Sequence, residues 1–115
     1  MGYTHYIKSH RAFTAKEWSD FTSEVKELIK NSTVPLANGA GDAGSKPLID
    51  KDCVCFNGVE EDSHETAYVT REAEGFSFCK TARKPYDEIV VEFYKLIRKY
   101  TGCVLSSDGG KEVFK

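Results

Sequence analysis

The sequence predicts an α+β fold, in which a mainly antiparallel sheet of four to five strands carries two helices on one face. Two segments place apolar residues at helical spacing, and short segments rich in β-branched and aromatic residues surround them. The expected order along the chain is strand, helix, three strands, helix, strand. With 115 residues, 40% of them hydrophobic and 30% charged, residues 1–115 are expected to form a single domain.

The first two elements are a strand at residues 2–8 and a helix that ends near Lys30. Alternation in the strand places His5 on the same face as two apolar residues. The helix begins after Thr14, because Thr14 followed by Glu17 three residues later is the pattern of a capping box. The buried stripe of this helix is expected to comprise Trp18, Phe21, Val25, Leu28 and Ile29.

The middle of the chain combines a long loop with three strands. Residues 31–50 are rich in Gly, Ala, Asn, Ser and Pro, so regular structure is costly there. A loop of this length in a compact domain is either disordered and flexible or a functional lid, and the sequence leaves both open. Strands are expected at residues 52–56 and 65–71, as a hairpin with an elaborated loop. Residues 76–80 are expected to form the third strand of that antiparallel run.

A second helix and a last strand complete the predicted fold. Pro85 suits the first turn of the helix, and Gly102 suits its end. The buried stripe of this helix is expected to comprise Ile89, Val90, Phe93, Leu96, Ile97 and Tyr100. A strand at residues 103–105 then leads into a polar loop with two glycines at residues 106–110.

Composition argues against several classes of protein. A net charge of −2 and a pI near 5.9 argue against binding to long nucleic acid, which requires many phosphates to be neutralised. No apolar run approaches the length of about 18 residues that spans a bilayer, and the N-terminal segment does not read as a secretory signal. A cytoplasmic location with reduced cysteines is therefore expected. No metal site or cofactor is indicated, because the cysteines lack the spacing of a zinc ribbon.

The segment at residues 78–87 is the most informative part of the sequence for function. It places Lys80, Thr81, Arg83 and Lys84 directly before a helix that starts near a proline. A helix N-terminus presents unpaired N–H groups and about half a positive charge, which favours phosphate or carboxylate. The lysines add flexible point charges, and Arg83 adds a planar fork that can bind phosphate through two hydrogen bonds. The sequence therefore predicts an anion site, with a solvated basic turn as the plain alternative.

Two further polar clusters follow strand ends and are expected to meet the basic turn in one pocket. The first contains Asn57, Asp62 and His64, and the second contains Ser107 and Asp108. Antiparallel strands bring such ends together, and binding residues often lie on loops above a rigid scaffold. In such a pocket these side chains would bind the polar groups of the ligand, while the basic turn would hold its phosphate.

Five segments resemble, in the same order, a group of short uncharacterised proteins from bacteria and their phages: MGYTHY, FNG, DSHET, FCKTARKPYD and SSDG. The resemblance covers nearly the whole chain, and FCKTARKPYD is specific. It implies a bacterial or phage origin, and hence the cytoplasm of a bacterial host if the protein is phage-encoded. Small phage proteins that sequester nucleotide immune signals are similar in size and in having phosphate-gripping pockets, which is an analogy of architecture alone.

The leading functional prediction is a protein that binds and sequesters a small phosphorylated, nucleotide-type ligand, as a phage antagonist of host immune signalling. Tyr86 is expected to stack on the planar ring of that ligand. The enzyme alternative is a phosphoesterase or nucleoside hydrolase with His64 and Asp62 as the acid–base pair. A third alternative is a protein–protein inhibitor that presents the acidic loop at residues 60–62. A homo-oligomer is compatible with each, because a neighbouring copy can supply pocket walls to a small domain.

Overall fold

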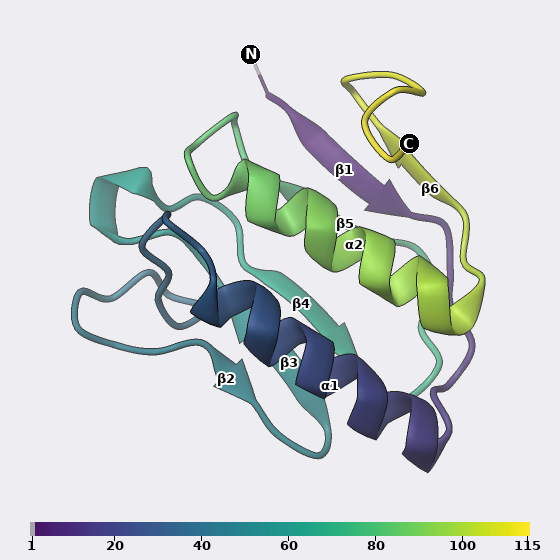
Figure 1. The fold of residues 1–115 in the computed structure, drawn as a ribbon. Coiled ribbons are helices and arrows are strands. Elements are labelled where there is room, and N and C mark those ends of the chain that lie inside the picture. Colours follow the sequence, from purple (N-terminus) through teal and green to yellow (C-terminus); the bar gives the residue numbers. More distant parts are fainter. Residues whose placement is uncertain (1) are drawn as a thin grey trace.

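The structure, a computed structural model, describes residues 2–115 and confirms the α+β fold (Figure 1). Within this range the strands make two three-stranded antiparallel sheets rather than one sheet of four to five strands. The strands are β1 (Thr4–Ile7), β2 (Leu48–Ile49), β3 (Cys53–Phe56), β4 (Ala67–Thr70), β5 (Ser77–Lys80) and β6 (Leu105–Ser107). The helices are α1 (Ala15–Lys30) and α2 (Asp87–Thr101), and a short 3-10 helix, η1, spans Glu60–Asp62.

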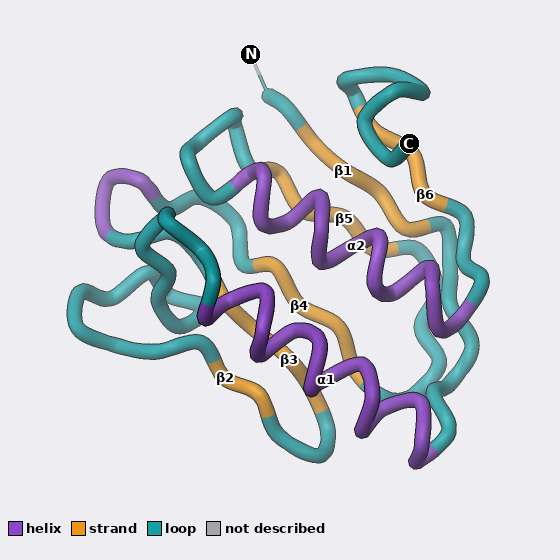
Figure 2. Tube along the Cα trace, in the orientation of Figure 1, coloured by secondary structure: helices purple, strands orange, loops and turns teal. Residues whose placement is uncertain are grey.

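The two sheets have the strand orders β5-β1-β6 and β2-β3-β4, and both helices cover the same side of them (Figure 2). The predicted hairpin of β3 with β4 is confirmed. The prediction that β5 extends this hairpin was wrong, because β5 pairs with β1. Two backbone hydrogen bonds between His10 and Glu74, of 3.0 and 3.1 Å, hold the β4–β5 connection against the chain that follows β1. This pairing joins segments far apart in the sequence, so local patterns do not reveal it.

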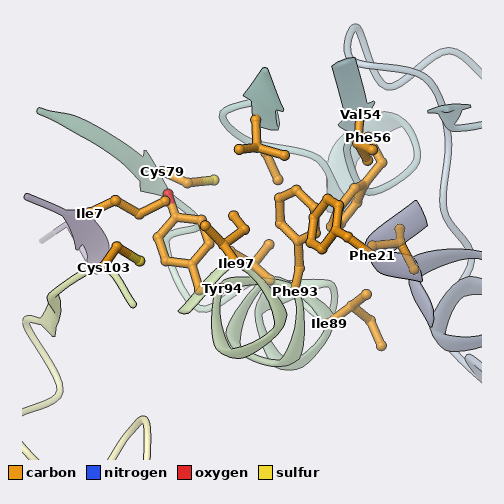
Figure 3. Packing of buried hydrophobic residues seen from close by; sticks show 14 of the residues in the cluster. Ile7, Phe21, Val54, Phe56, Cys79, Ile89, Phe93, Tyr94, Ile97 and Cys103 are labelled. Carbon is orange, nitrogen blue, oxygen red and sulfur yellow. The ribbon is translucent and has the colours of Figure 1, made fainter. Parts of the chain in front are cut away.

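The hydrophobic core lies between the helices and the two sheets. Figure 3 shows Phe93 of α2 close to Phe21 of α1 and Phe56 of β3, and the ring centroids are 6.0 and 5.1 Å from that of Phe93. Most of the predicted stripe residues are buried, namely Trp18, Phe21, Val25, Ile89, Val90, Phe93 and Ile97. The other four, Leu28, Ile29, Leu96 and Tyr100, are partly buried and pack against the core. Tyr94, which the predicted stripe omitted, is also buried and packs on the side of Ile7 (Figure 3).

The helix boundaries follow from their caps. Thr14 accepts the N–H of Glu17 at 3.1 Å, and the Glu17 carboxylate accepts the N–H of Thr14 at 2.9 Å, so the predicted capping box is confirmed. Helix α2 begins at Asp87 with Tyr86 as its N-cap, which leaves Pro85 just outside the first turn. The same helix ends before Gly102, whose φ of 72° is a left-handed conformation that glycine adopts without strain.

The last strand lies two residues later than predicted. A strand was expected at residues 103–105, whereas β6 spans Leu105–Ser107 and pairs with β1. The chain turns at Gly102 and buries Cys103 before it reaches the sheet, so pairing begins only at Leu105. As a result Ser107, which was expected in a loop, lies in a paired strand opposite His5.

The segment at residues 31–50 is held by hydrogen bonds to neighbouring loops. The side-chain oxygen of Asn38 accepts two backbone N–H groups of its own turn, at 3.1 and 3.2 Å. The carbonyl of Gly39 accepts hydrogen bonds from Asn57 and Thr66, at 3.1 and 2.6 Å. The segment also contains β2, which the sequence did not predict. These contacts favour a structured connection over the disordered alternative.

Candidate functional site

The predicted basic turn is tightly wound. The N–H groups of Thr81 and Ala82 both donate to the carbonyl of Tyr3, at 3.0 and 3.2 Å. Ala82 and Arg83 have φ values of 52° and 58°, so two successive residues other than glycine are left-handed. Thr81 is fully buried, and its hydroxyl donates to the carboxylate of Asp87. Thr81 therefore braces the turn against α2 and has no exposed surface to offer a ligand.

Three N–H groups at the N-terminus of α2, where the anion site was predicted, already have backbone partners. The N–H of Asp87 donates to the carbonyl of Lys84 at 2.8 Å. Those of Ile89 and Val90 donate to the carbonyl of Tyr86 at 3.0 and 3.1 Å. The Asp87 carboxylate also supplies a negative charge to this end of the helix. This end of the helix therefore attracts anions less than the sequence predicted.

Those three cationic side chains point in different directions. The Arg83 guanidinium carbon lies 3.8 Å from the centroid of the Tyr3 ring. Lys84 Nζ donates to the backbone carbonyl of Glu61 at 2.8 Å. Lys80 is exposed and runs beside Gly2. The three cations therefore do not form one anion clamp, and Lys80 is the one least engaged by other groups.

The Asn57 cluster divides into a buried residue and two exposed ones. Asn57 is 2% exposed, and its side chain donates to the carbonyls of Gly39 and His64 and accepts the N–H groups of Gly58 and His64. The donor and acceptor atoms of the Asn57 side chain are occupied by hydrogen bonds that join loops. In this structure Asn57 therefore has a structural role. Asp62 and His64 are exposed. Among the hydrogen bonds of residues 2–115 none joins these two side chains, so the expected acid–base pair has no preformed geometry.

The second cluster and Tyr86 are also engaged within the protein. The carboxylate of Asp108 accepts the N–H of Thr4 at 3.1 Å and the hydroxyl of Tyr6 at 3.0 Å. Ser107 Oγ lies 2.8 Å from Nδ1 of His5. Tyr86 is fully buried and donates to the carbonyl of Glu65 at 2.6 Å, and with Asp62 and Pro85 it lines a separate pocket of about 240 Å³. The three predicted clusters thus do not meet in one pocket.

A cleft lies between β4 and β5, where the two sheets part. Ala67 and Val69 of β4 and Cys79 of β5 are buried in the core, so by alternation Tyr68 and Phe78 face away from the helices. The cleft has a volume of about 500 Å³. Its walls are formed by His64, Glu65, Thr66, Tyr68, Phe76, Ser77 and Phe78.

The aromatic walls of this cleft are unusually exposed for their size. Tyr68, Phe78 and Phe76 are 39%, 48% and 65% exposed. The ring of Tyr6 stacks on that of Phe76 with centroids 5.9 Å apart, and Phe76 lies at the same distance from Phe78. Exposed apolar groups gathered in one place mark binding surfaces more often than scattered ones do. The sequence held a signal for this surface, because the alternation at residues 76–80 sets Phe76 and Phe78 opposite the buried Cys79.

Polar groups line one end of the cleft. Glu65 accepts the N–H of Lys80 on one carboxylate oxygen at 2.7 Å, and its own N–H donates to the carbonyl of Lys80 at 3.1 Å. Exposed His64 lies next to Glu65 in the cleft wall. Lys80 follows Phe78 by two residues on the same outward side of β5, about 7 Å further along the strand. The cleft therefore combines aromatic rings with an imidazole and a carboxylate, and a lysine lies beyond its polar end.

Comparisons with known proteins add no assignment, since no protein-family model, curated protein or solved structure matches the chain. Residues 2–115 contain no helix that is long and apolar enough to cross a membrane. The same residues contain no group of three or more His, Cys, Asp or Glu side chains placed to hold a metal ion.

Proposed function

We propose that the protein binds a small ligand of nucleotide type in the cleft between β4 and β5 and holds it chemically unchanged. The observation that carries the proposal is the cleft itself, which has aromatic walls and a polar end. Its volume of about 500 Å³ lies within the range of about 300–1,000 Å³ that is typical of small-ligand sites. A nucleobase is the planar group that the rings of Tyr68 and Phe78 would accommodate by stacking.

The polar end supplies complementary groups for the rest of such a ligand. The carboxylate of Glu65 can accept a hydrogen bond from an exocyclic amine, and His64 can donate to or accept from the sugar or base. Lys80 is exposed on a flexible stem, so its ammonium can turn from Gly2 towards a phosphate at the end of β5. Binding without turnover is favoured because, within residues 2–115, no carboxylate is hydrogen-bonded to the His64 ring to orient it as a general base.

Sequestration of a host signal by a phage-encoded protein would be the biological use of such a site. That part of the proposal rests on the resemblance of the chain to short phage and bacterial proteins. The cleft supports only the chemical class of the ligand, namely a planar ring with an anionic group.

Calorimetric titration with adenosine monophosphate, adenosine and inorganic phosphate tests the proposal. We expect the nucleotide to bind more tightly than either part alone, and Phe78→Ala to weaken it about tenfold, since stacking on one ring contributes about 1–3 kcal/mol. Val104→Ala is the matched control, because Val104 is another exposed apolar residue, at 62%, that does not line the cleft.

Chromatography of the ligand released by heating separates binding from catalysis. Intact adenosine monophosphate after long incubation is the expected result. Conversion to product would support an enzyme instead. Failure of this nucleotide and of a cyclic dinucleotide to bind, or equal binding by wild type and Phe78→Ala, would overturn the proposed use of the cleft.

A further inference from the structure

A chain of hydrogen bonds joins Ser107 of β6, His5 of β1 and Asp87 of α2. The Nδ1 atom of His5 lies 2.8 Å from Ser107 Oγ, and its Nε2 atom lies 2.7 Å from a carboxylate oxygen of Asp87. His5 is completely buried, and the rings of Tyr3 and Phe114 pack against it with centroids 5.1 and 5.5 Å away. The imidazole is therefore held in one orientation between a hydroxyl and a carboxylate.

The chemistry of the partners assigns the protons along this chain. Burial raises the pKa of Asp87, but hydrogen bonds from His5 and Thr81 and electrostatic attraction to His5 and Arg83 outweigh it, so this pKa lies below its ordinary value. An ionised carboxylate only accepts hydrogen bonds, so Nε2 of His5 carries the hydrogen. In the neutral imidazole Nδ1 is then an acceptor, and the Ser107 hydroxyl donates to it. A serine hydroxyl bonded to an oriented imidazole is the arrangement of an activated nucleophile.

The surroundings of Ser107 also suit a nucleophile. The N–H of Gly109 donates to Ser107 Oγ at 3.0 Å, which helps to hold that oxygen in place beside His5. Ser107 is half-buried and lines a cavity of about 170 Å³, together with Leu105, Ser106, Gly110 and Lys111. The cavity is small, with one apolar wall from Leu105 and a cation from Lys111. It would admit a short acyl group.

We infer that Ser107 is a nucleophile towards short-chain acyl esters, with His5 as its general base and Asp87 as the positioning residue. Ser107 Oγ forms a bond to the ester carbonyl carbon while its proton passes to His5 Nδ1. The bond between that carbon and the ester oxygen then breaks, and the departing alkoxide takes the proton from His5. Water then attacks the acyl carbon while its proton passes to His5 Nδ1. The bond from that carbon to Ser107 Oγ breaks, Oγ takes the proton from His5, and a carboxylic acid is released.

This inference is independent of the proposed ligand cleft. Ser107 shares its strand face with Leu105 and pairs with the buried His5, which places it on the helix side of the sheet. The rings of Tyr68 and Phe78 lie on the opposite side of their strands. A reactive Ser107 differs from a serine that only satisfies a buried histidine in its reaction with an electrophile.

Labelling with an alkyl fluorophosphonate is that test. Attack by Ser107 forms an oxygen–phosphorus bond, fluoride leaves, and the proton passes to His5, so no further reactant is needed. We expect mass spectrometry of the digested protein to locate the adduct on Ser107. Ser107→Ala should abolish the adduct, and Ser19→Ala should leave it unchanged, because Ser19 is an exposed serine of α1 outside the cavity.

Asp87→Asn tests the positioning role without removing the nucleophile. We expect the labelling rate to fall by at least about a hundredfold, and its pH dependence to change, because the amide no longer fixes the hydrogen on Nε2. Thermal melts of each variant establish that it is folded. Absence of an adduct on Ser107 in the folded wild-type protein, or a labelling rate unchanged in folded Asp87→Asn, would overturn the inference.

Discussion

The guanidinium of Arg83 stacks on the ring of Tyr3, with its central carbon 3.8 Å from the ring centroid. Tyr3 is 9% exposed and shares the inward side of its strand with His5 and Ile7, so Arg83 lies on the helix side of the sheet. It also lowers the pKa of nearby Asp87. Lys80, by contrast, lies on the outward side with Phe78. The basic turn thus places Arg83 on the helix side of the sheet and Lys80 on the outward side. The sequence of the turn does not reveal this difference.

The first prediction separates these two cations. Lys80→Ala should weaken the binding of adenosine monophosphate about tenfold, since a hydrogen bond to a charged group contributes about 1.5–3 kcal/mol when fully formed. Arg83→Ala should leave the affinity within about a factor of two, and should lower stability by about 0.5–1 kcal/mol through loss of the cation–π contact. Calorimetric titration and thermal melts measure both. A larger loss of affinity in Arg83→Ala than in Lys80→Ala would show that Arg83, and not Lys80, binds the phosphate.

A second prediction concerns the strained turn. Ala82 has a φ of 52°, a left-handed conformation that costs most residues about 1–2 kcal/mol but costs glycine nothing. Ala82→Gly should therefore stabilise the protein by about 0.5–1 kcal/mol, after allowance for the greater freedom of glycine in the unfolded chain.

Ala43→Gly is the control for this change, because Ala43 is an exposed loop alanine outside the left-handed region. Urea titration measures the stability of both variants, and Ala43→Gly should be neutral or slightly destabilising. Destabilisation by Ala82→Gly would show that the turn does not hold the described conformation in solution.

The sequence predicted those elements whose signals are local. Thr14 and Glu17 set the start of α1 within one turn, and Gly102 sets the end of α2. The pairing of β5 with β1 was missed, because it depends on contacts such as that between His10 and Glu74, which lie far apart in the sequence.

The candidate sites divide in the same way. The basic turn was visible as a run of charges, but its engagement with Tyr3 and with the start of α2 required the fold. The bond between His5 and Ser107 joins residues 102 positions apart, so no local motif could reveal it. Residues Phe76 and Phe78 could have been recognised from alternation, yet only the gap between the two sheets makes a cleft beside them.

A third prediction is a dependence of stability on pH that arises at Glu17. Hydrogen bonds from Arg11 and from the backbone of Thr14 lower the pKa of Glu17 from 4.5 to about 2. A carboxyl group whose pKa is depressed by folding stabilises the protein above its unfolded pKa and loses that contribution as pH falls through its folded pKa. The free energy of unfolding should therefore decline between about pH 4.5 and pH 2.

Urea titrations of wild type and Glu17→Gln across this range isolate the contribution. The difference in stability between the two proteins should be largest near neutral pH and should shrink towards pH 2, because glutamine retains the capping hydrogen bond but not the charge. Arg11→Ala should make the free energy of unfolding depend less steeply on pH over the same range. A difference that does not change with pH would show that Glu17 is not paired with Arg11.

The final prediction tests whether Asn57 holds the connection at residues 31–50 against the β3–β4 loop. Asn57→Asp preserves the size of the side chain and can still accept the N–H groups of Gly58 and His64. It cannot donate to the carbonyls of Gly39 and His64, and a carboxylate oxygen would face them instead. Because two buried acceptors lose their donor and a charge is buried, stability at neutral pH should fall by about 2–4 kcal/mol.

Urea unfolding measures this loss of stability. Asn31→Asp is the exposed control at the C-terminus of α1, and it should change stability by less than about 1 kcal/mol. Equal effects of the two substitutions would mean that the loops are not joined through Asn57.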